Sequence, residues 1–169
     1  MVRANRRIKK DARSGFFVAV LYAVLNPEER LLSFSNAGQT QPIHYSARTR
    51  EVALLEGLGD SFPLGILDTA DYQETEFPLE PGDKVIFYTD GVVEAMNKKQ
   101  EIFGFERFQE VVRNAGGLPA DALLQEIAAQ VAAFVKDAPQ HDDLTVIVVA
   151  VDEDRAEKQE EHHEPDKEK

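Results

Sequence analysis

Apolar residues along this chain fall into short runs whose period changes about halfway along. The continuous apolar run at 16–25 predicts a fully buried strand, and the run at 31–36 is its hairpin partner after the Asn26-Pro27 turn. Shorter strands are expected at 42–46 and 51–55, an edge strand at 72–77, and a strongly apolar strand at 84–88. The first half of the chain is therefore built from antiparallel hairpins.

Helical spacing replaces the strand pattern after residue 91. One helix is expected to end at Gly116-Gly117, and a second to lie between Pro119 and Pro139. The residues that define their apolar faces are Phe103, Phe105, Phe108, Val111 and Val112 in the first, and Leu123, Ile127, Val131 and Phe134 in the second. A final apolar run at 144–149 predicts a last strand, and residues 2–12 are compatible with a short helix. Hairpins followed by helices indicate an α+β fold.

Composition narrows the function classes. With 169 residues, of which 43% are hydrophobic, one globular domain is expected. The net charge of −12 argues against a nucleic-acid surface, and the absence of cysteine excludes disulfides and thiolate chemistry. No run is long enough to span a membrane, so we expect a cytoplasmic location and no membrane contact from this segment. Residues 152–169 are charged and lack large aliphatic side chains, which predicts a disordered acidic tail.

Carboxylates stand at the ends of the two most apolar late strands. Asp90 follows the 84–88 strand, and Asp142-Asp143 precedes the 144–149 strand. Taken singly, Asp90 is also a good turn residue, and Asp142-Asp143 could only solvate a loop. If these rim positions converge, they form an oxygen-rich site of the kind that Mg²⁺ or Mn²⁺ prefers.

Other patterns carry less chemistry. Residues 90–101 have the length of a calcium-binding EF-hand loop, but Val92 cannot be a ligand and Ala95 replaces the required glycine. Gly57-x-Gly59 lacks the third glycine of a dinucleotide loop. His141 could assist proton transfer, although a single loop histidine is more often only solvated.

Five motifs in order carry a resemblance to a known family. They are residues 34–42 (FSNAGQTQP), 62–66 (FPLGI), 81–95 (PGDKVIFYTDGVVEA), 103–104 (FG) and 142–145 (DDLT). This series, within residues 14–151, resembles the SpoIIE-type bacterial branch of the PPM metal-dependent serine/threonine protein phosphatases.

The resemblance implies a partial α-β-β-α sandwich with mostly antiparallel sheets and two Mn²⁺ or Mg²⁺ ions at one end. It implies that Asp90 and Asp142 are metal ligands, that Asp143 is a ligand or orients one, and that Gly91 contributes its backbone. The implied reaction is hydrolysis of phosphoserine or phosphothreonine by a metal-activated water. The implied substrate is a phosphoprotein of bacterial signalling, typically an anti-sigma-factor antagonist.

Two features depart from the family pattern. Gln39 follows Gly38 where the family has histidine, and residues 1–15 match neither of the upstream Gly-Asp motifs that supply further metal ligands. We therefore expect residues 1–13 to be the end of an upstream helix and 14–151 the C-terminal portion of the phosphatase domain. The chain is then either a fragment of a longer protein or a degenerate copy, and by itself it is expected to be inactive. The alternative function is a catalytically inactive, phosphatase-like binding or regulatory module.

Overall fold

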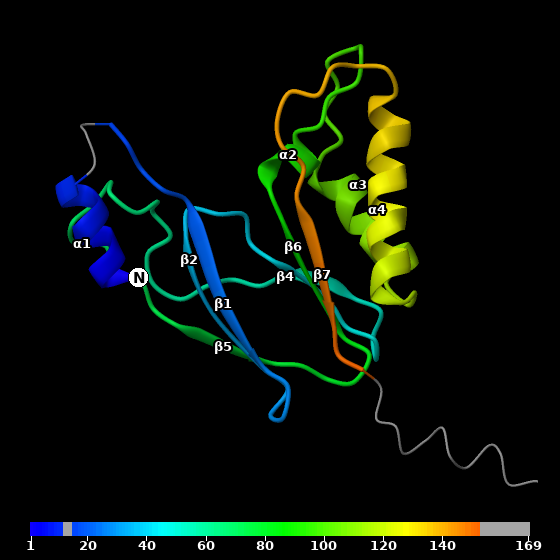
Figure 1. Cartoon of the computed structure of the whole chain (residues 1–169). Helices are drawn as coiled ribbons and strands as arrows, with labels where there is room; N and C mark the ends of the chain where they lie inside the picture. Colours follow the sequence, from blue (N-terminus) through cyan, green and yellow to red (C-terminus); the bar gives the residue numbers. More distant parts are fainter. Residues whose placement is uncertain (12–14, 153–169) are drawn as a thin grey trace, which may run out of the picture.

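A computed structural model describes residues 1–11 and 15–152 of the chain (Figure 1). In chain order the elements are α1 (Val2–Asp11), β1 (Val20–Asn26), β2 (Leu31–Ala37), β3 (Ile43–Tyr45), β4 (Val52–Leu54), β5 (Thr75–Pro78), β6 (Lys84–Tyr88), α2 (Asp90–Val93), α3 (Phe105–Ala115), α4 (Ala120–Val135) and β7 (Val146–Ala150). The disordered acidic tail predicted at residues 152–169 lies outside the described residues, apart from Asp152.

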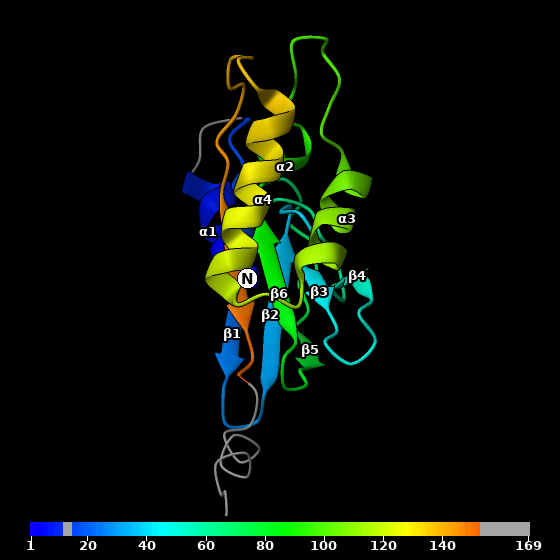
Figure 2. The same cartoon turned by 90° about the vertical axis from the view of Figure 1, so that its right-hand side faces the viewer.

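Two antiparallel sheets lie face to face. One has three strands in the order β1-β2-β5, and the other has four in the order β4-β3-β6-β7. Figure 1 shows α1 beside one end of the three-stranded sheet, while α3 and α4 cover the far face of the four-stranded sheet. Figure 2 shows α3 and α4 side by side over that face. The predicted partial α-β-β-α sandwich is confirmed.

The larger core lies between the four-stranded sheet and the two long helices. Ile86 and Tyr88 project from β6 to this side, where the Phe108 ring meets the Tyr88 ring edge-on at 4.8 Å between centroids. Leu123, Ile127 and Val131 complete this core from α4, as their spacing predicts. Gly116 follows α3 with right-handed angles (φ −61°, ψ −22°), and a Cβ there would collide with the Tyr45 ring. The glycine is thus needed for close packing rather than for a left-handed helix end.

A second core fills the space between the sheets. Leu32 and Phe34 from β2 pack there against Leu55, Leu79 and Val85. Because alternate residues of a strand point to opposite faces, β6 serves both cores. The strand is buried on both sides, which explains why residues 84–88 lack polar alternation.

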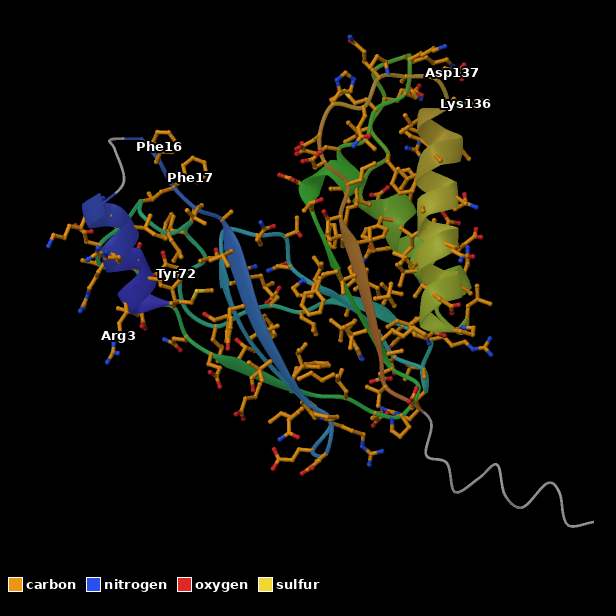
Figure 3. All side chains as sticks on the ribbon, in the orientation of Figure 1. Arg3, Phe16, Phe17, Tyr72, Lys136 and Asp137 are labelled. Carbon is orange, nitrogen blue, oxygen red and sulfur yellow. The ribbon has the colours of Figure 1, made fainter. Side chains whose placement is uncertain are left out.

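The expectation that residues 16–25 form a fully buried strand is wrong. The strand β1 begins only at Val20 and is an edge strand, so one side of it has no neighbour among the described residues. Tyr22 is 63% exposed and Val24 47% exposed on the face away from the second sheet. Phe16 and Phe17 lie in the connection from α1 and are also exposed (Figure 3). Continuous apolar sequence indicated burial, but the position of the strand in its sheet decided otherwise.

Candidate active site

Hydrogen bonds from Thr89 hold the end of β6 against the residues that precede β7. Its backbone N–H donates to the Thr145 carbonyl at 3.1 Å, and its hydroxyl oxygen accepts the Thr145 N–H at 3.0 Å. The same hydroxyl donates to the Asp143 carbonyl at 2.9 Å. These bonds extend the β6–β7 pairing beyond Tyr88 and Val146, so the chain segments that carry Asp90 and Asp142-Asp143 run next to each other.

Gly91 brings the two acidic segments into contact. It lies in α2 with ordinary helical angles, yet a Cβ at this position would stand 2.5 Å from the Asp143 carbonyl oxygen and 3.5 Å from Asp142 Cβ. Any side chain at position 91 would force the segments apart. The glycine of the Asp-Gly motif is therefore needed because the backbone of residues 142–143 passes so close to it.

The paired ends of β6 and β7 carry Asp90, Asp142 and Asp143, and we call this part of the molecule the acidic edge. All three carboxylates there are exposed. Asp90 Oδ1 accepts the Gly91 N–H at 3.0 Å, and Asp142 Oδ1 accepts the Asp143 N–H at 2.7 Å. Each bond fixes one oxygen of its carboxylate close to the backbone. The structure thus brings the acidic residues to one edge, as the strand-end pattern predicts, and their role as metal ligands stays a prediction.

The oxygen ligands at this edge are of the type that a hard divalent cation prefers, but among the described residues they are too few to hold one. Mg²⁺ and Mn²⁺ bind carboxylate and carbonyl oxygens, which are the groups present at this edge. Within residues 1–11 and 15–152, however, no three acidic or histidine side chains converge closely enough to hold a metal ion. Among the described residues, the edge therefore has the type of oxygen ligand that these ions prefer but not the number that would hold one.

The Asn36–Thr40 turn reaches the same end of the sandwich. The Asn36 side chain accepts the Gln39 N–H and donates to the Gln39 carbonyl, both at 2.9 Å. Gly38 has φ +90°, and a Cβ there would collide with Pro63 of the FPLG segment. The Thr40 hydroxyl donates to the Tyr88 carbonyl, one residue before Thr89. Gln39, which stands where the family has histidine, donates from its side chain to the Ala19 carbonyl at 3.4 Å and so lies beside the entry to β1.

His141 is exposed and lies in the loop before β7. Within the described residues its ring makes no hydrogen bond or ion pair, so its suggested part in proton transfer has no structural support beyond its nearness to Asp142. It lines a cavity of about 570 Å³ between α2, α4 and the 138–146 segment, which we call the α4 cleft. Asp142 and Gly91 line the same cleft.

The Pro81-Gly82-Asp83 motif lies at the other end of β6. Asp83 is 2% exposed and accepts the Ala47 N–H at 2.9 Å, the Glu80 N–H at 3.0 Å and a bond from His44 Nε2 at 2.9 Å. Burial alone would raise the pKa of Asp83, but the two backbone donors and His44 outweigh it and lower the pKa below its usual value. This aspartate serves the fold rather than the acidic edge.

Sequence reasoning missed the threonines that assemble this end of the molecule. Thr89 and Thr145 link the end of β6 to the start of β7, and Thr40 links the turn after β2 to the end of β6. The only signal was a threonine close to an aspartate at both strand ends: Thr89 directly precedes Asp90, and Thr145 follows Asp143 by two residues. That signal acquires meaning only when β6 and β7 are known to pair.

The family model of stage II sporulation protein E (SpoIIE) matches residues 1–152. The chain belongs to the SpoIIE family. The phosphoserine phosphatase RsbU of Bacillus subtilis is 27% identical to it over 156 residues, which are 86% of this chain and 42% of RsbU. The SiaA-PP2C domain of Pseudomonas aeruginosa is 26% identical with a TM-score of 0.62, and the match covers 73% of this chain and 48% of that one.

A structure of RsbX in complex with magnesium shares the fold with a TM-score of 0.58 at 18% identity, over 87% of this chain and 60% of that one. This SpoIIE-family chain therefore spans about half the length of the first relatives that it matches, or less. No helix in residues 1–11 and 15–152 is long and apolar enough to cross a membrane.

Proposed function

We propose that this chain contributes part of the active site of a metal-dependent phosphoserine/phosphothreonine protein phosphatase. The observation that carries the proposal is the contact between the Asp90 and Asp142 segments, held by Thr89 and made possible by Gly91. Carboxylates that share an edge, on a chain without cysteine, favour metal-assisted hydrolysis over a covalent thiol mechanism.

The chain's own residues would position the metal and the substrate. Asp90 and Asp142 would be ligands, and Asp143 and the Gly91 backbone would contribute further oxygens or orient the ligands. When bound, Mn²⁺ or Mg²⁺ supplies an activated water near neutral pH and neutralises phosphate charge. RsbX, which shares the fold, has been solved with magnesium. Thr89 would act as a positioning residue because its hydroxyl holds the Asp143 carbonyl.

We infer that further metal ligands come from outside the described residues. Within residues 1–11 and 15–152, both β1 and β7 are edge strands. A cavity of about 460 Å³ lies between them, lined by Gln39, Thr89 and Thr145 among others. Additional chain entering there would reach the acidic edge and could add carboxylates to it. With only the present donors, Mn²⁺ binding should be weak, with a dissociation constant of roughly millimolar order.

The relatives support a proposal for the substrate class. RsbU is a phosphoserine phosphatase, and a similar structure contains RsbU and RsbW domains in one protein. We propose a phosphorylated regulatory protein of bacterial signalling as the substrate, of the anti-sigma-factor antagonist class that the family resemblance implies.

A second candidate function is a phosphatase-like binding module without hydrolysis. The observation that favours it is the incomplete donor set among the described residues. Such a module would keep the fold and the substrate contacts and would release no phosphate.

Phosphate release from a phosphoserine protein in the presence of Mn²⁺ separates these functions. The substrate is incubated with the longest polypeptide that contains this chain in its native reading frame, and with the 169-residue chain alone. The longer polypeptide should release phosphate, and Asp90→Asn or Asp142→Asn should abolish the release. Asp137→Asn, at an exposed acid that pairs with Lys98, is the matched control and should leave turnover unchanged.

Failure of the longer polypeptide to release phosphate would refute the enzymatic function and support the binding module. Robust turnover by the 169-residue chain, removed by both Asn substitutions, would instead refute the inference that further ligands are needed.

A further inference from the structure

The α4 cleft is the feature of this molecule that the metal chemistry leaves unused. Its floor is apolar and buried, formed by Val92, Ile127 and Val131. Its volume of about 570 Å³ exceeds that of any single side chain and lies within the range of ligand-binding pockets. Leu124 and Leu144 also line it and are 37% and 42% exposed, so apolar surface is open to solvent here.

Small residues on α4 keep the cleft open. Ala128 and Ala132 lie one turn apart on the helix and line one wall, while their neighbours Ile127 and Val131 fill the core. Larger side chains at positions 128 and 132 would project into the space. Ala129, next along the helix, is exposed and lies outside the lining.

The cleft is continuous with the acidic edge. Gly91 and Asp142, which lie next to each other at the proposed metal site, form part of its lining. An occupant of the cleft therefore lies next to the position where a phosphate would bind. The simplest molecule that fills both at once is a phosphoprotein segment with a large apolar side chain close to its phosphorylated residue.

Lys136 adds a positive charge that could attract an acidic group of a phosphoprotein segment. Of the described residues that line the cleft, it is the one lysine or arginine, among the acids Glu94 and Asp142. It follows α4 with φ 53° and ψ −123°, in a turn closed by the Ala138 N–H and the Val135 carbonyl at 3.1 Å. This backbone region favours glycine, and strained residues of this kind cluster at functional sites. Figure 3 shows Lys136 and Asp137 where the chain leaves α4.

We propose that the α4 cleft receives a large apolar side chain of the phosphoprotein substrate, while Lys136 contacts an acidic group on the same segment. This inference rests on the proposed function and specifies its substrate: a phosphoserine flanked by an aliphatic or aromatic residue. The acidic edge, with its metal, then selects the phosphate, and the α4 cleft selects the sequence around it.

Binding of fluorescein-labelled phosphoserine decapeptides to the 169-residue chain with Mn²⁺ tests this, measured by anisotropy. In an alanine background, one leucine is moved through the positions that flank the phosphoserine. Leucine at one or two positions should lower the dissociation constant about tenfold or more, as expected for burial of that side chain. Ala128→Phe should remove the gain by filling the cleft, and Ala129→Phe, the matched control on the same helix, should keep it.

Lys136→Gly supplies an independent measurement. It removes the charge and also relieves the unfavourable φ, so it should weaken binding of the best peptide about three- to tenfold while the thermal midpoint stays the same or rises. A merely structural role for Lys136 predicts a lower midpoint or unchanged binding.

A flat leucine scan, or equal effects of Ala128→Phe and Ala129→Phe, would overturn the proposal. A leucine gain that is equal at every position, with or without the phosphate, would also overturn it, because the cleft would then bind apolar side chains in no fixed register with the phosphate. Failure of the proposed function is seen separately, as absence of phosphate release from the longer polypeptide.

Discussion

Asp83 is the buried charge on which the stability of this fold should depend most visibly. Replacing it by alanine leaves the N–H groups of Ala47 and Glu80 and the ring of His44 without their acceptor in a buried site. Hydrogen bonds to a charged group contribute roughly 1.5–3 kcal/mol each, and they are not additive. Removing one member of a buried pair costs about 3–5 kcal/mol. Asp83→Ala should therefore reduce the free energy of unfolding by about 3–5 kcal/mol, a large part of the total for a domain.

Urea denaturation followed by circular dichroism measures this loss. With a slope of roughly 1–3 kcal/mol per molar urea, the midpoint should fall by at least about 1 M. Asp137→Ala is the control, because Asp137 forms an exposed ion pair with Lys98 at 3.2 Å and surface pairs contribute about 0–1 kcal/mol.

The pH dependence gives a second, sharper check. Because the hydrogen bonds lower the pKa of Asp83 in the folded state, the ionised carboxylate stabilises the fold. That contribution is fully present above the unfolded value of about 3.9, and it is lost as the pH falls through the lower folded pKa. The difference in the free energy of unfolding between wild type and Asp83→Ala should therefore be large above about pH 5 and shrink below about pH 4. A variant as stable as Asp137→Ala, or a difference that grows on acidification, would refute the reasoning.

Two further substitutions test the acidic edge and the core. Gly91→Ala places a methyl group 2.5 Å from the Asp143 carbonyl and should cost about 1–3 kcal/mol and weaken Mn²⁺ binding. Gly57→Ala, whose nearest contact would be an ordinary 3.6 Å, is its control, and equal behaviour of the two would contradict the close approach. Phe108→Ala removes a fully buried ring and should cost about 3–5 kcal/mol in urea denaturation, whereas Ile102→Ala, 51% exposed, should cost little. A neutral Phe108→Ala would mean that α3 does not pack as described.

Local sequence determined most elements of this protein. Period-two and continuous apolar runs located the hairpins and β6, and helical spacing located α3 and α4, because side-chain periodicity directly reflects which face of an element is buried. The ends were less well determined. The second helix was expected to continue to Pro139, but α4 ends earlier, at Val135. The motif order also anticipated the SpoIIE family, since Asp-Gly and Asp-Asp at strand ends are local features of the sequence.

Tertiary structure alone decided how these pieces meet. The apolar run at 16–25 could not reveal that β1 is an edge strand, because burial depends on strand neighbours that a local pattern does not record. Thr89 and Gly91 look like ordinary turn residues, and only the β6–β7 pairing gives them their roles. The α4 cleft is likewise invisible in the sequence, because Ala128 and Ala132 are good helix formers in any context. Spacing along the chain fixes which residues share a face. Convergence of Asp90 and Asp142, which are more than 50 positions apart in the sequence, depends instead on distances between elements that only the packed fold sets.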